Sequence, residues 1–393
     1  MKSWLPEGGA NLFQAIKAVR DDAVRGGVRV KDLSIGQPGG PALESASKAA
    51  AEAVLSRQEA MHEYQDNGSP GVPGFAERFV AGHVNADLSG KKVGYVPIPG
   101  IKPMLAVVIQ ACGAGTKVVA TTTNPGYPTP KVQAEYLGKW FFEPTINPDN
   151  GFLFAPQELD CTGLSERIGL VMLNYPHNPS GAGASEIWMR SACHYCERTG
   201  KRLFNDAAYA FLSYGRRLCL ADVAWEFPDL SWAEAFSASK LGGNMTGWRV
   251  GAMVGSPDFI GDIKIIKGNT DSGFCAPMAA GALYALEHDQ EGIQKVVDLY
   301  ARRASLLCDI LQKAGMRLAL KPQAGFFTLW QTPKRAFGQE IRSAEDFNYK
   351  MIQNTGLVGV HFDPYMRYAV ASADVEAIAP DIRSAFEKAE VSY

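Results

Sequence analysis

Short loops with polar side chains follow several apolar runs in this 393-residue chain. Asn205–Tyr209 holds the carboxylate of Asp206 and the phenol of Tyr209 directly after one such run. A charged carboxylate inside a protein is unfavourable unless a cation pairs with it, so a buried Asp206 implies a cationic partner. Ser237–Lys240 and Thr246–Arg249 follow the next apolar run and add two basic side chains. These loops are therefore candidate parts of one site.

Three other loops could bind an anion or a ring. In Pro99–Lys102 a glycine allows a ligand to approach the backbone, and the helix predicted to follow would offer free N–H groups to an anion. Asn124–Pro128 presents the ring of Tyr127, and Asn174–Gly181 presents the amide of Asn178. Taken alone, each loop is equally compatible with an ordinary helix start, a turn or a packed ring.

The elements that would position these loops alternate between strand and helix from about residue 90 to residue 255. Alternation at this spacing predicts an α/β fold with a mostly parallel sheet, which binds ligands at the carboxyl ends of its strands. Ser185 and Gly200 predict the two ends of a helix over Glu186–Arg198. The other elements predicted here are strands at Gly94–Val96, Lys117–Thr121, Trp140–Glu143, Ile168–Leu173, Arg202–Asn205, Trp232–Phe236 and Val250–Val254, and helices at Pro103–Ala111 and Thr129–Leu137.

After residue 280 the pattern becomes that of a smaller α+β unit. The elements predicted there are one long helix from Gly281 to Lys313, strands at Arg317–Leu320, Gly325–Trp330 and Met366–Ala371, and helices at Ala344–Asn354 and Asp374–Lys388. We expect this unit to include the N-terminal segment. The predicted domains are a large one over residues 46–284 and a discontinuous small one formed by residues 1–45 and 285–393.

The composition argues against several classes of protein. Lys and Arg number 39 against 41 Asp and Glu, and no basic run is longer than a pair, so we expect no nucleic-acid partner. Apolar stretches such as Met104–Ile109 are far shorter than the roughly 20 residues that a membrane-spanning helix needs. The first residues show no apolar run of the signal-peptide type, so we expect a cytoplasmic protein.

The cysteines do not form a recognisable pattern. Seven are scattered along the chain, an odd number that does not predict a disulfide framework. Only Cys193 and Cys196 are close together, and a zinc or redox site would need a second ligand pair or a strand-to-helix turn. We therefore expect both to be ordinary helix residues, and we predict no metal site.

Taken together and in order, these motifs resemble those of the class I and II aminotransferases, fold-type I enzymes that depend on pyridoxal 5'-phosphate (PLP). The resemblance extends from Leu33–Pro38 to Met366–Ala369, which is nearly the whole chain. The run Lys267–Phe274 most resembles the LL-diaminopimelate aminotransferase branch. The resemblance implies a large α/β domain with a mostly parallel sheet and a smaller α+β domain.

The resemblance also implies roles for the residues around the cofactor. Lys240 would form a Schiff base with the PLP aldehyde and act as the base that moves the Cα proton. Asp206 would pair with the pyridinium nitrogen. Tyr209 and Asn178 would hydrogen-bond to the phenolic oxygen of the ring, and Tyr127 would stack on its face.

Separate residues would bind the phosphate and the substrate. The groups implied for the phosphate all donate hydrogen bonds, and they are the backbone N–H groups of Ile101 and Lys102 and the side chains of Ser237, Ser239 and Arg249. Arg367 would hold the substrate α-carboxylate, with the Gly36 backbone and Asn178 nearby. Tyr64 resembles the tyrosine that reaches the phosphate of a neighbouring subunit, and Asn269 or Thr270 would be contributed in the same way, so we expect a homodimer.

Three departures from the family pattern affect these expectations. Arg249 follows Lys240 by nine residues where the family usually has eight, and the Gly242-Gly243 pair is the expected place for the extra residue. The gap from Tyr64 to the following turn is about two residues longer than usual. Val358–Pro364 is several residues shorter than the usual loop, which would either change the side-chain specificity of the substrate pocket or leave one of its walls more open.

We therefore predict a PLP-dependent aminotransferase that moves an amino group between an amino acid and a 2-oxo acid. A PLP-dependent lyase, decarboxylase or cyclising biosynthetic enzyme remains open, because each would use the same lysine and aspartate. A PLP-binding regulator would carry a DNA-binding domain before the fold, and we expect the residues before Leu33 to be too few for one. A dinucleotide-binding protein would need a G-x-G-x-x-G motif after a strand, which the sequence lacks. The amino donor and acceptor stay open.

Overall fold

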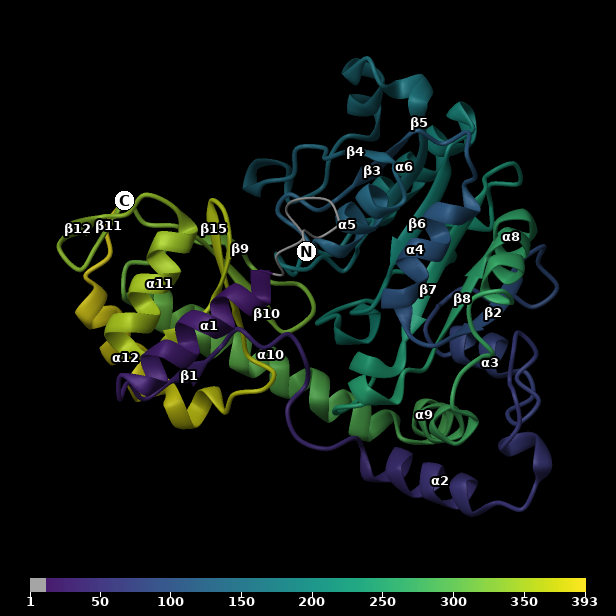
Figure 1. Ribbon diagram of the computed structural model, residues 1–393, viewed down its shortest axis with the longest axis horizontal. Helices are drawn as coiled ribbons and strands as arrows, with labels where there is room; N and C mark the ends of the chain where they lie inside the picture. The colour runs from purple at the N-terminus through teal and green to yellow at the C-terminus, as the bar shows by residue number, and fades with distance from the viewer. Residues whose placement is uncertain (1–11) are drawn as a thin grey trace, which may run out of the picture.

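The computed structural model describes residues 12–393, which form two main sheets with helices packed on them and two further sheets of two short strands each. In Figure 1 the larger sheet lies to the right and the smaller one to the left, with α10 (Gln290–Lys313) running between the two parts. Residues 1–11 are outside the described part of the chain. The first residues of the predicted 1–45 segment therefore lie outside the described residues. The same holds for the N-terminal residues in which we expect no signal-type run.

Seven strands form the larger sheet. They are β2 (Gly94–Ile98), β3 (Val118–Thr121), β4 (Trp140–Phe142), β5 (Ile168–Leu173), β6 (Arg202–Asp206), β7 (Trp232–Ser237) and β8 (Gly251–Gly255), in the order β2-β8-β7-β6-β5-β3-β4. Only β8 runs against its neighbours β2 and β7. The prediction of an α/β fold with a mostly parallel sheet is confirmed.

Helices cover both faces of this sheet because successive strand residues point to opposite sides. In β6, Leu203 packs against one helical layer and Phe204 against the other. The first layer contains α3 (Phe75–Ala81), α6 (Glu186–Thr199), α7 (Ala221–Ala224) and α9 (Ala276–His288). The second contains α4 (Ile101–Ala111), α5 (Thr129–Tyr136) and α8 (Pro257–Lys267). The central strands are thus buried on both sides, as their apolar runs predict.

The caps predicted for α6 are both confirmed. The Ser185 hydroxyl accepts a hydrogen bond from the Trp188 N–H at 3.2 Å, and Gly200 ends the helix in the left-handed conformation at φ 64°. Cys193 and Cys196 are buried helix residues of α6, and burial raises the pKa of the Cys196 thiol to about 12. Both are therefore protonated, structural thiols, as expected.

The smaller sheet is antiparallel, with the order β14-β15-β10-β9. Its strands are β9 (Leu318–Leu320), β10 (Phe327–Gln331), β14 (Val360–Phe362) and β15 (Tyr365–Ala369). The helices and short strands near it are α1 (Leu12–Arg25), α10, α11 (Ala344–Thr355), α12 (Val375–Ala389), β1 (Lys31–Asp32), β11 (Arg335–Ala336), β12 (Gln339–Glu340) and β13 (Leu357–Val358). The remaining helix, α2 (Glu44–Leu55), lies along α9 at the edge of the molecule (Figure 1). Within residues 12–393, no helix is both long and apolar enough to span a membrane.

The single long helix predicted from Gly281 to Lys313 is wrong. The chain forms α9 and α10 instead, separated at Asp289, whose backbone leaves the helical region at φ −126° and ψ 50°. The Asp289 carboxylate accepts from the Gly292 N–H at 2.9 Å, so it caps the start of α10. Aspartate is a strong N-cap residue. At this cap the chain passes from α9, beside the larger sheet, to α10, which leads to the smaller sheet.

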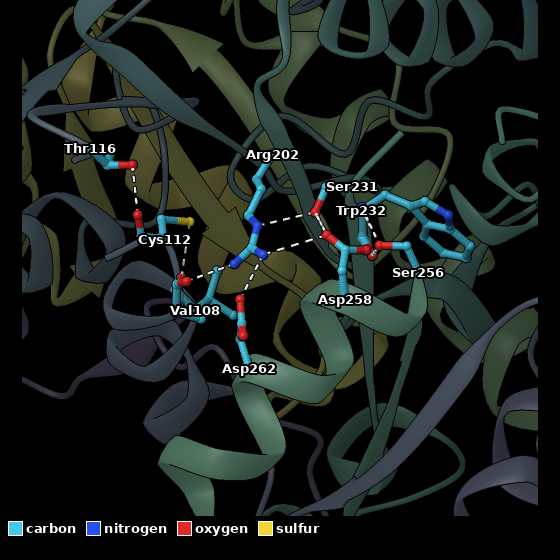
Figure 2. Close-up of polar contacts among 10 residues, drawn as sticks. Val108, Cys112, Thr116, Arg202, Ser231, Trp232, Ser256, Asp258 and Asp262 are labelled. Carbon is cyan, nitrogen blue, oxygen red and sulfur yellow. Dashed lines mark hydrogen bonds and ion pairs between the residues drawn. The ribbon is translucent and has the colours of Figure 1, made fainter. Parts of the chain in front are cut away.

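An arginine network fixes helices at the end of the sheet where β6 begins (Figure 2). The Arg202 guanidinium donates to the carbonyl of Ala111 at 2.6 Å, to Asp262 at 2.6 Å and to Ser231 at 3.1 Å. These contacts tie the last turn of α4 to α8 and to the strand entrance of β7. The first turn of α4 lies at the opposite ends of the strands, where the polar loops are located.

Candidate active site

A cavity of about 770 Å³ lies at the carboxyl ends of the parallel strands. Its lining includes most of the side chains predicted for the site, namely Gly36, Ile101, Lys102, Tyr127, Asn178, Asp206, Tyr209, Ser237, Ser239, Lys240, Arg249 and Arg367. These residues come from segments as far apart as Gly36 and Arg367. The structure therefore brings together in space a set that the sequence spreads over the chain.

Asp206 ends β6 and points into the cavity with only 7% of its surface exposed. Its carboxylate accepts a hydrogen bond from the Ala208 N–H at 3.1 Å, and no basic side chain within residues 12–393 forms an ion pair with it. Burial raises the pKa of Asp206 to about 7, while the Ala208 N–H and Lys240 act in the opposite direction. A cationic ring nitrogen would supply the missing partner, so this position fits PLP.

Lys240 ends a short 3-10 turn, Ala238–Lys240, directly after β7. Its ammonium donates to the Gly36 carbonyl at 3.0 Å. Burial lowers the pKa of Lys240 to about 7, assisted by the positive charges of Arg367 and Arg249 and opposed by Asp206. Near neutral pH a large share of this amine is uncharged, which is the form that acts as nucleophile or base.

The first turn of α4 lies close to the Arg249 guanidinium, and Gly100 lies between the two. Gly100 has φ 79°, and a Cβ on it would lie 2.5 Å from Nη2 of Arg249, so only glycine leaves room for this arrangement. The N–H groups of Ile101 and Lys102 lie in the first turn of α4, where no helical carbonyl precedes them to accept a hydrogen bond. A helix N-terminus beside an arginine is suited to a phosphate group.

Two serines border the same end of the cavity. The Ser237 and Ser239 hydroxyls are 2.9 Å apart, and the Ser239 N–H donates to the Ser237 hydroxyl at 3.1 Å. The pair therefore forms a compact polar wall at the end of β7. Its hydroxyls add two donors to those of α4 and Arg249, and this donor set fits the phosphate of PLP.

The glycine pair between Lys240 and Arg249, the expected place of the extra residue, forms a turn that packs closely on the segment near Pro41. Gly243 has φ 67°, and a Cβ on it would lie 2.6 Å from the carbonyl of Pro41. The next residue, Asn244, donates its N–H to the same carbonyl at 3.1 Å. The longer turn thus packs against the segment before α2, and Arg249 still reaches Gly100.

Arg367 lies in β15 and is 1% exposed. Its guanidinium donates to the Asn178 side-chain oxygen at 3.0 Å and to the Ser34 carbonyl at 2.9 Å, and its centre lies 4.2 Å from the centre of the Phe327 ring. Its Nε has no hydrogen-bond partner among the described residues. Burial lowers the pKa of Arg367 to about 10, so the group stays positive at neutral pH. The Asn178 side-chain oxygen and the Ser34 carbonyl are both neutral. They do not balance the positive charge of Arg367, which can therefore bind a carboxylate.

Tyr127 and Tyr209 give the cavity its aromatic surfaces. Tyr127 is half-buried, and the turn before it is possible only because Gly126 has no Cβ, which would lie 2.1 Å from the Thr122 carbonyl. Tyr209 packs edge-on against Phe327 with ring centres 5.5 Å apart. Burial raises the pKa of Tyr209, so its phenol remains protonated and can donate a hydrogen bond.

Tyr64 is not brought to this cavity. It is 78% exposed and does not line the site of its own chain. Asn269 and Thr270 are also exposed, and their side chains donate to the carbonyls of Ile265 and Ile266 in α8. The contribution of these residues to a second subunit stays a prediction.

Several cavity residues were not predicted from the sequence. They include Phe13, Gln37, Gln133, Thr246 and Phe327, together with Asn174 from a loop that was singled out for Asn178. Phe327 resembles any other apolar residue of a strand, so no pattern marks it. Before Arg367, β14 and β15 join through a tight turn in which Phe362 pairs with Tyr365, which agrees with the short connection seen in the sequence.

Comparison with known proteins agrees with this geometry. Residues 28–378 match the model of the family described as aminotransferase class I and II. The chain is 28% identical to an LL-diaminopimelate aminotransferase of Methanocaldococcus jannaschii over 367 residues, covering 91% of this chain and 85% of the relative. It is also 28% identical to the enzyme of that name from Natranaerobius thermophilus over 375 residues, covering 90% of each. The predicted family is confirmed, and both of these relatives carry the name of the predicted branch.

Solved structures show the same fold. The aspartate aminotransferase from Rhizobium meliloti superposes with a TM-score of 0.85 over 99% of both chains at 21% identity. Substrate-bound BacF from Bacillus subtilis superposes with a TM-score of 0.84, covering 99% of this chain and 98% of that one at 20% identity. The fold-type I architecture predicted from the motifs is thereby confirmed.

Proposed function

Because this chain belongs to the class I and II aminotransferase family, it is a PLP-dependent transaminase, and we propose that Lys240, Asp206 and Arg367 perform its reaction. One observation supports this assignment most strongly. Within a single cavity, Asp206 has no cationic partner and Arg367 has no anionic one among the described residues. The ring nitrogen of PLP and the carboxylate of an amino acid would satisfy both groups.

Each part of the cofactor would be bound by residues whose chemistry suits it. Asp206 would keep the ring nitrogen protonated, Asn178 and Tyr209 would hydrogen-bond to the phenolic oxygen, and Tyr127 would cover a ring face. The groups proposed for the phosphate are the N–H groups of Ile101 and Lys102 and the side chains of Ser237, Ser239 and Arg249. When bound, PLP supplies an electron sink for the bonds at the substrate Cα.

Lys240 is proposed to move the proton. Its lowered pKa leaves Nζ partly uncharged near neutral pH, so Nζ can take up the proton of the substrate Cα and later release it. Arg367 holds the α-carboxylate and thereby sets where Cα lies relative to Nζ.

We further propose a cytoplasmic homodimer of two-domain subunits. Tyr64 is exposed on its own chain, and Val54, Leu55 and Tyr284 are exposed apolar residues of the neighbouring helices α2 and α9, which supports a subunit contact there. All seven cysteines are free, which suits a reducing compartment. Two apolar clusters, one with most of its members within residues 46–284 and the other with most within residues 285–393, support the division into residues 46–284 and residues 1–45 with 285–393.

A donor panel tests the function. The enzyme loaded with PLP is mixed with single amino acids, including LL-diaminopimelate because the relatives carry that name, together with acidic, aromatic and aliphatic donors. We expect at least one donor to yield pyridoxamine phosphate and an equal amount of its 2-oxo acid. Release of ammonia or carbon dioxide without pyridoxamine phosphate would instead indicate the lyase or decarboxylase alternative, which the comparisons do not support.

A further inference from the structure

We propose that Glu234 is a positioning residue that acts through Asn205 to fix the loop carrying Asn178. This inference rests on the proposed role of Asn178 at the site. Glu234 lies in β7 and is completely buried, and it does not line the cavity. Any effect of Glu234 on ligand binding must therefore pass through other residues.

Glu234 is surrounded by hydrogen-bond donors. Its carboxylate accepts from the N–H groups of Leu220 at 2.9 Å and Ala221 at 2.7 Å, and from the Asn205 side-chain amide at 2.7 Å. Burial raises the pKa of Glu234, whereas these three donors favour its charged form. With its oxygens bound only to donors, the group is fitted to accept hydrogen bonds, not to give one.

The Glu234 carboxylate and the Tyr175 backbone together fix which way the Asn205 amide points. The Asn205 oxygen accepts from the Tyr175 N–H at 2.9 Å, and its nitrogen donates to the Tyr175 carbonyl at 2.9 Å as well as to Glu234. A flipped amide would place its oxygen against the Glu234 carboxylate and its nitrogen against an N–H. Glu234 thus adds a charged acceptor to the orientation that the Tyr175 backbone also requires, and holds the Asn205 amide in place from the β7 side.

From Tyr175 the buried contacts continue to the site. The Asn174 side chain donates to the Asp206 carbonyl at 2.9 Å and accepts from the Asn178 N–H at 3.1 Å. The Asn178 side-chain oxygen then accepts from Arg367 at 3.0 Å. Asn205 and Asp206 are adjacent in β6, and their side chains point to opposite faces of the sheet. The same strand therefore holds the loop of Asn178 through Asn205 and presents the Asp206 carboxylate to the cavity.

The test measures ligand binding, with Glu234→Gln as the variant. The probe is the 2-methyl analogue of the best amino donor from the panel, which has no Cα hydrogen, so it can join the cofactor through its amine but cannot undergo proton transfer at Cα. Its dissociation constant is measured by calorimetry on the PLP-loaded enzyme. We expect E234Q to weaken binding about fivefold, because a misplaced Asn178 no longer supports Arg367.

Asp222→Asn is the matched control. The Asp222 carboxylate accepts from the N–H groups of Cys219 at 2.8 Å and Ala86 at 2.9 Å, so it also anchors the start of α7 but has no contact with Asn205. We expect D222N to lower the melting temperature as E234Q does and to leave the dissociation constant within about twofold of wild type.

A double-mutant cycle with Asn178→Ala decides the inference. In the N178A background, E234Q should change the dissociation constant by less than about twofold, because the residue it acts through is gone. An equal loss in both backgrounds overturns the inference while the role of Asn178 stands, and an Asn178→Ala variant that binds like wild type refutes that role itself. If E234Q does not fold, Asn205→Ser, which keeps both backbone contacts of Glu234, must give the same non-additive result.

Discussion

Lys240 lies among groups that act on its amine in opposite directions. Burial and the charges of Arg367 and Arg249 disfavour the ammonium, whereas the carboxylate of Asp206 favours it. Burial and the two arginine charges outweigh the effect of Asp206, and the pKa of Lys240 falls from 10.5 to about 7. An ordinary exposed lysine would be almost fully protonated at neutral pH.

The cofactor-free enzyme should therefore capture PLP with a rate that rises with pH and is half-maximal near pH 7. Below pH 7 the protonated amine cannot attack the aldehyde, so the rate should fall about tenfold per pH unit. Stopped-flow absorbance of PLP binding measures this profile.

Asp206→Asn provides the control for this profile. Because Asp206 raises the pKa of Lys240, the variant should shift the midpoint to lower pH. A midpoint near the ordinary lysine value of about 10 in the wild type, or an upward shift in D206N, would contradict the proposed environment of the amine.

At the scale of elements, helix α4 serves the site through its first turn. Gly100 has φ 79°, and its missing Cβ leaves room for the Arg249 guanidinium. Gly100→Ala should weaken PLP binding about tenfold or more, because the methyl group displaces Arg249 from the phosphate. A fluorescence titration of the cofactor-free protein gives the dissociation constant.

Gly113→Ala, at the other end of α4, is the matched variant. Gly113 has φ 68°, but no atom lies within 4 Å of the place that a Cβ would take, so its substitution brings the backbone strain without the clash. Both variants should lose unfolding free energy, G100A the more because φ 79° and ψ 163° are conformations that only glycine adopts readily, and only G100A should lose affinity for PLP. Equal affinities in the two variants would refute the proposed role of the α4 turn.

Elements set by local sequence were predictable. The Ser185 and Gly200 caps and the apolar run Ile168–Leu173 act within a few residues, and the structure contains each of them. The break at Asp289 was missed because apolar periodicity continues through it, although aspartate is a good cap. Phe327 and the Glu234–Asn205 contact depend on packing between distant segments, which no local pattern encodes.

The same distinction applies to the site. Lys240, Asp206 and Arg367 were found because their loops resemble a family in order and spacing, and the cavity contains all three. The reach of Arg249 could not be judged from the sequence, since it depends on how the turn at Gly243 packs against Pro41.

At the scale of the whole molecule, the proposed dimer makes each site depend on two chains. Lys240→Ala removes the lysine from a chain's own site, whereas Tyr64→Ala would impair the site of its partner. In a mixed dimer of these two variants, one site has both defects and the other has neither. An equal mixture allowed to exchange subunits should therefore recover about a quarter of wild-type activity.

The assay is the rate of 2-oxo acid formation before and after mixing, with sedimentation to confirm dimers. Each variant alone should be far less active than wild type. If the mixture shows only the average of its two components, Tyr64 is not shared between subunits and that part of the account is wrong.

The most direct test of the central claim is to identify the lysine that binds PLP. Borohydride reduction of the PLP-loaded enzyme fixes the cofactor to its lysine, and peptide mass spectrometry locates it. The account predicts one modified peptide, carrying PLP on Lys240, and no modification at Lys102, the other lysine of the cavity. Modification of a different lysine, or none at all, would contradict it.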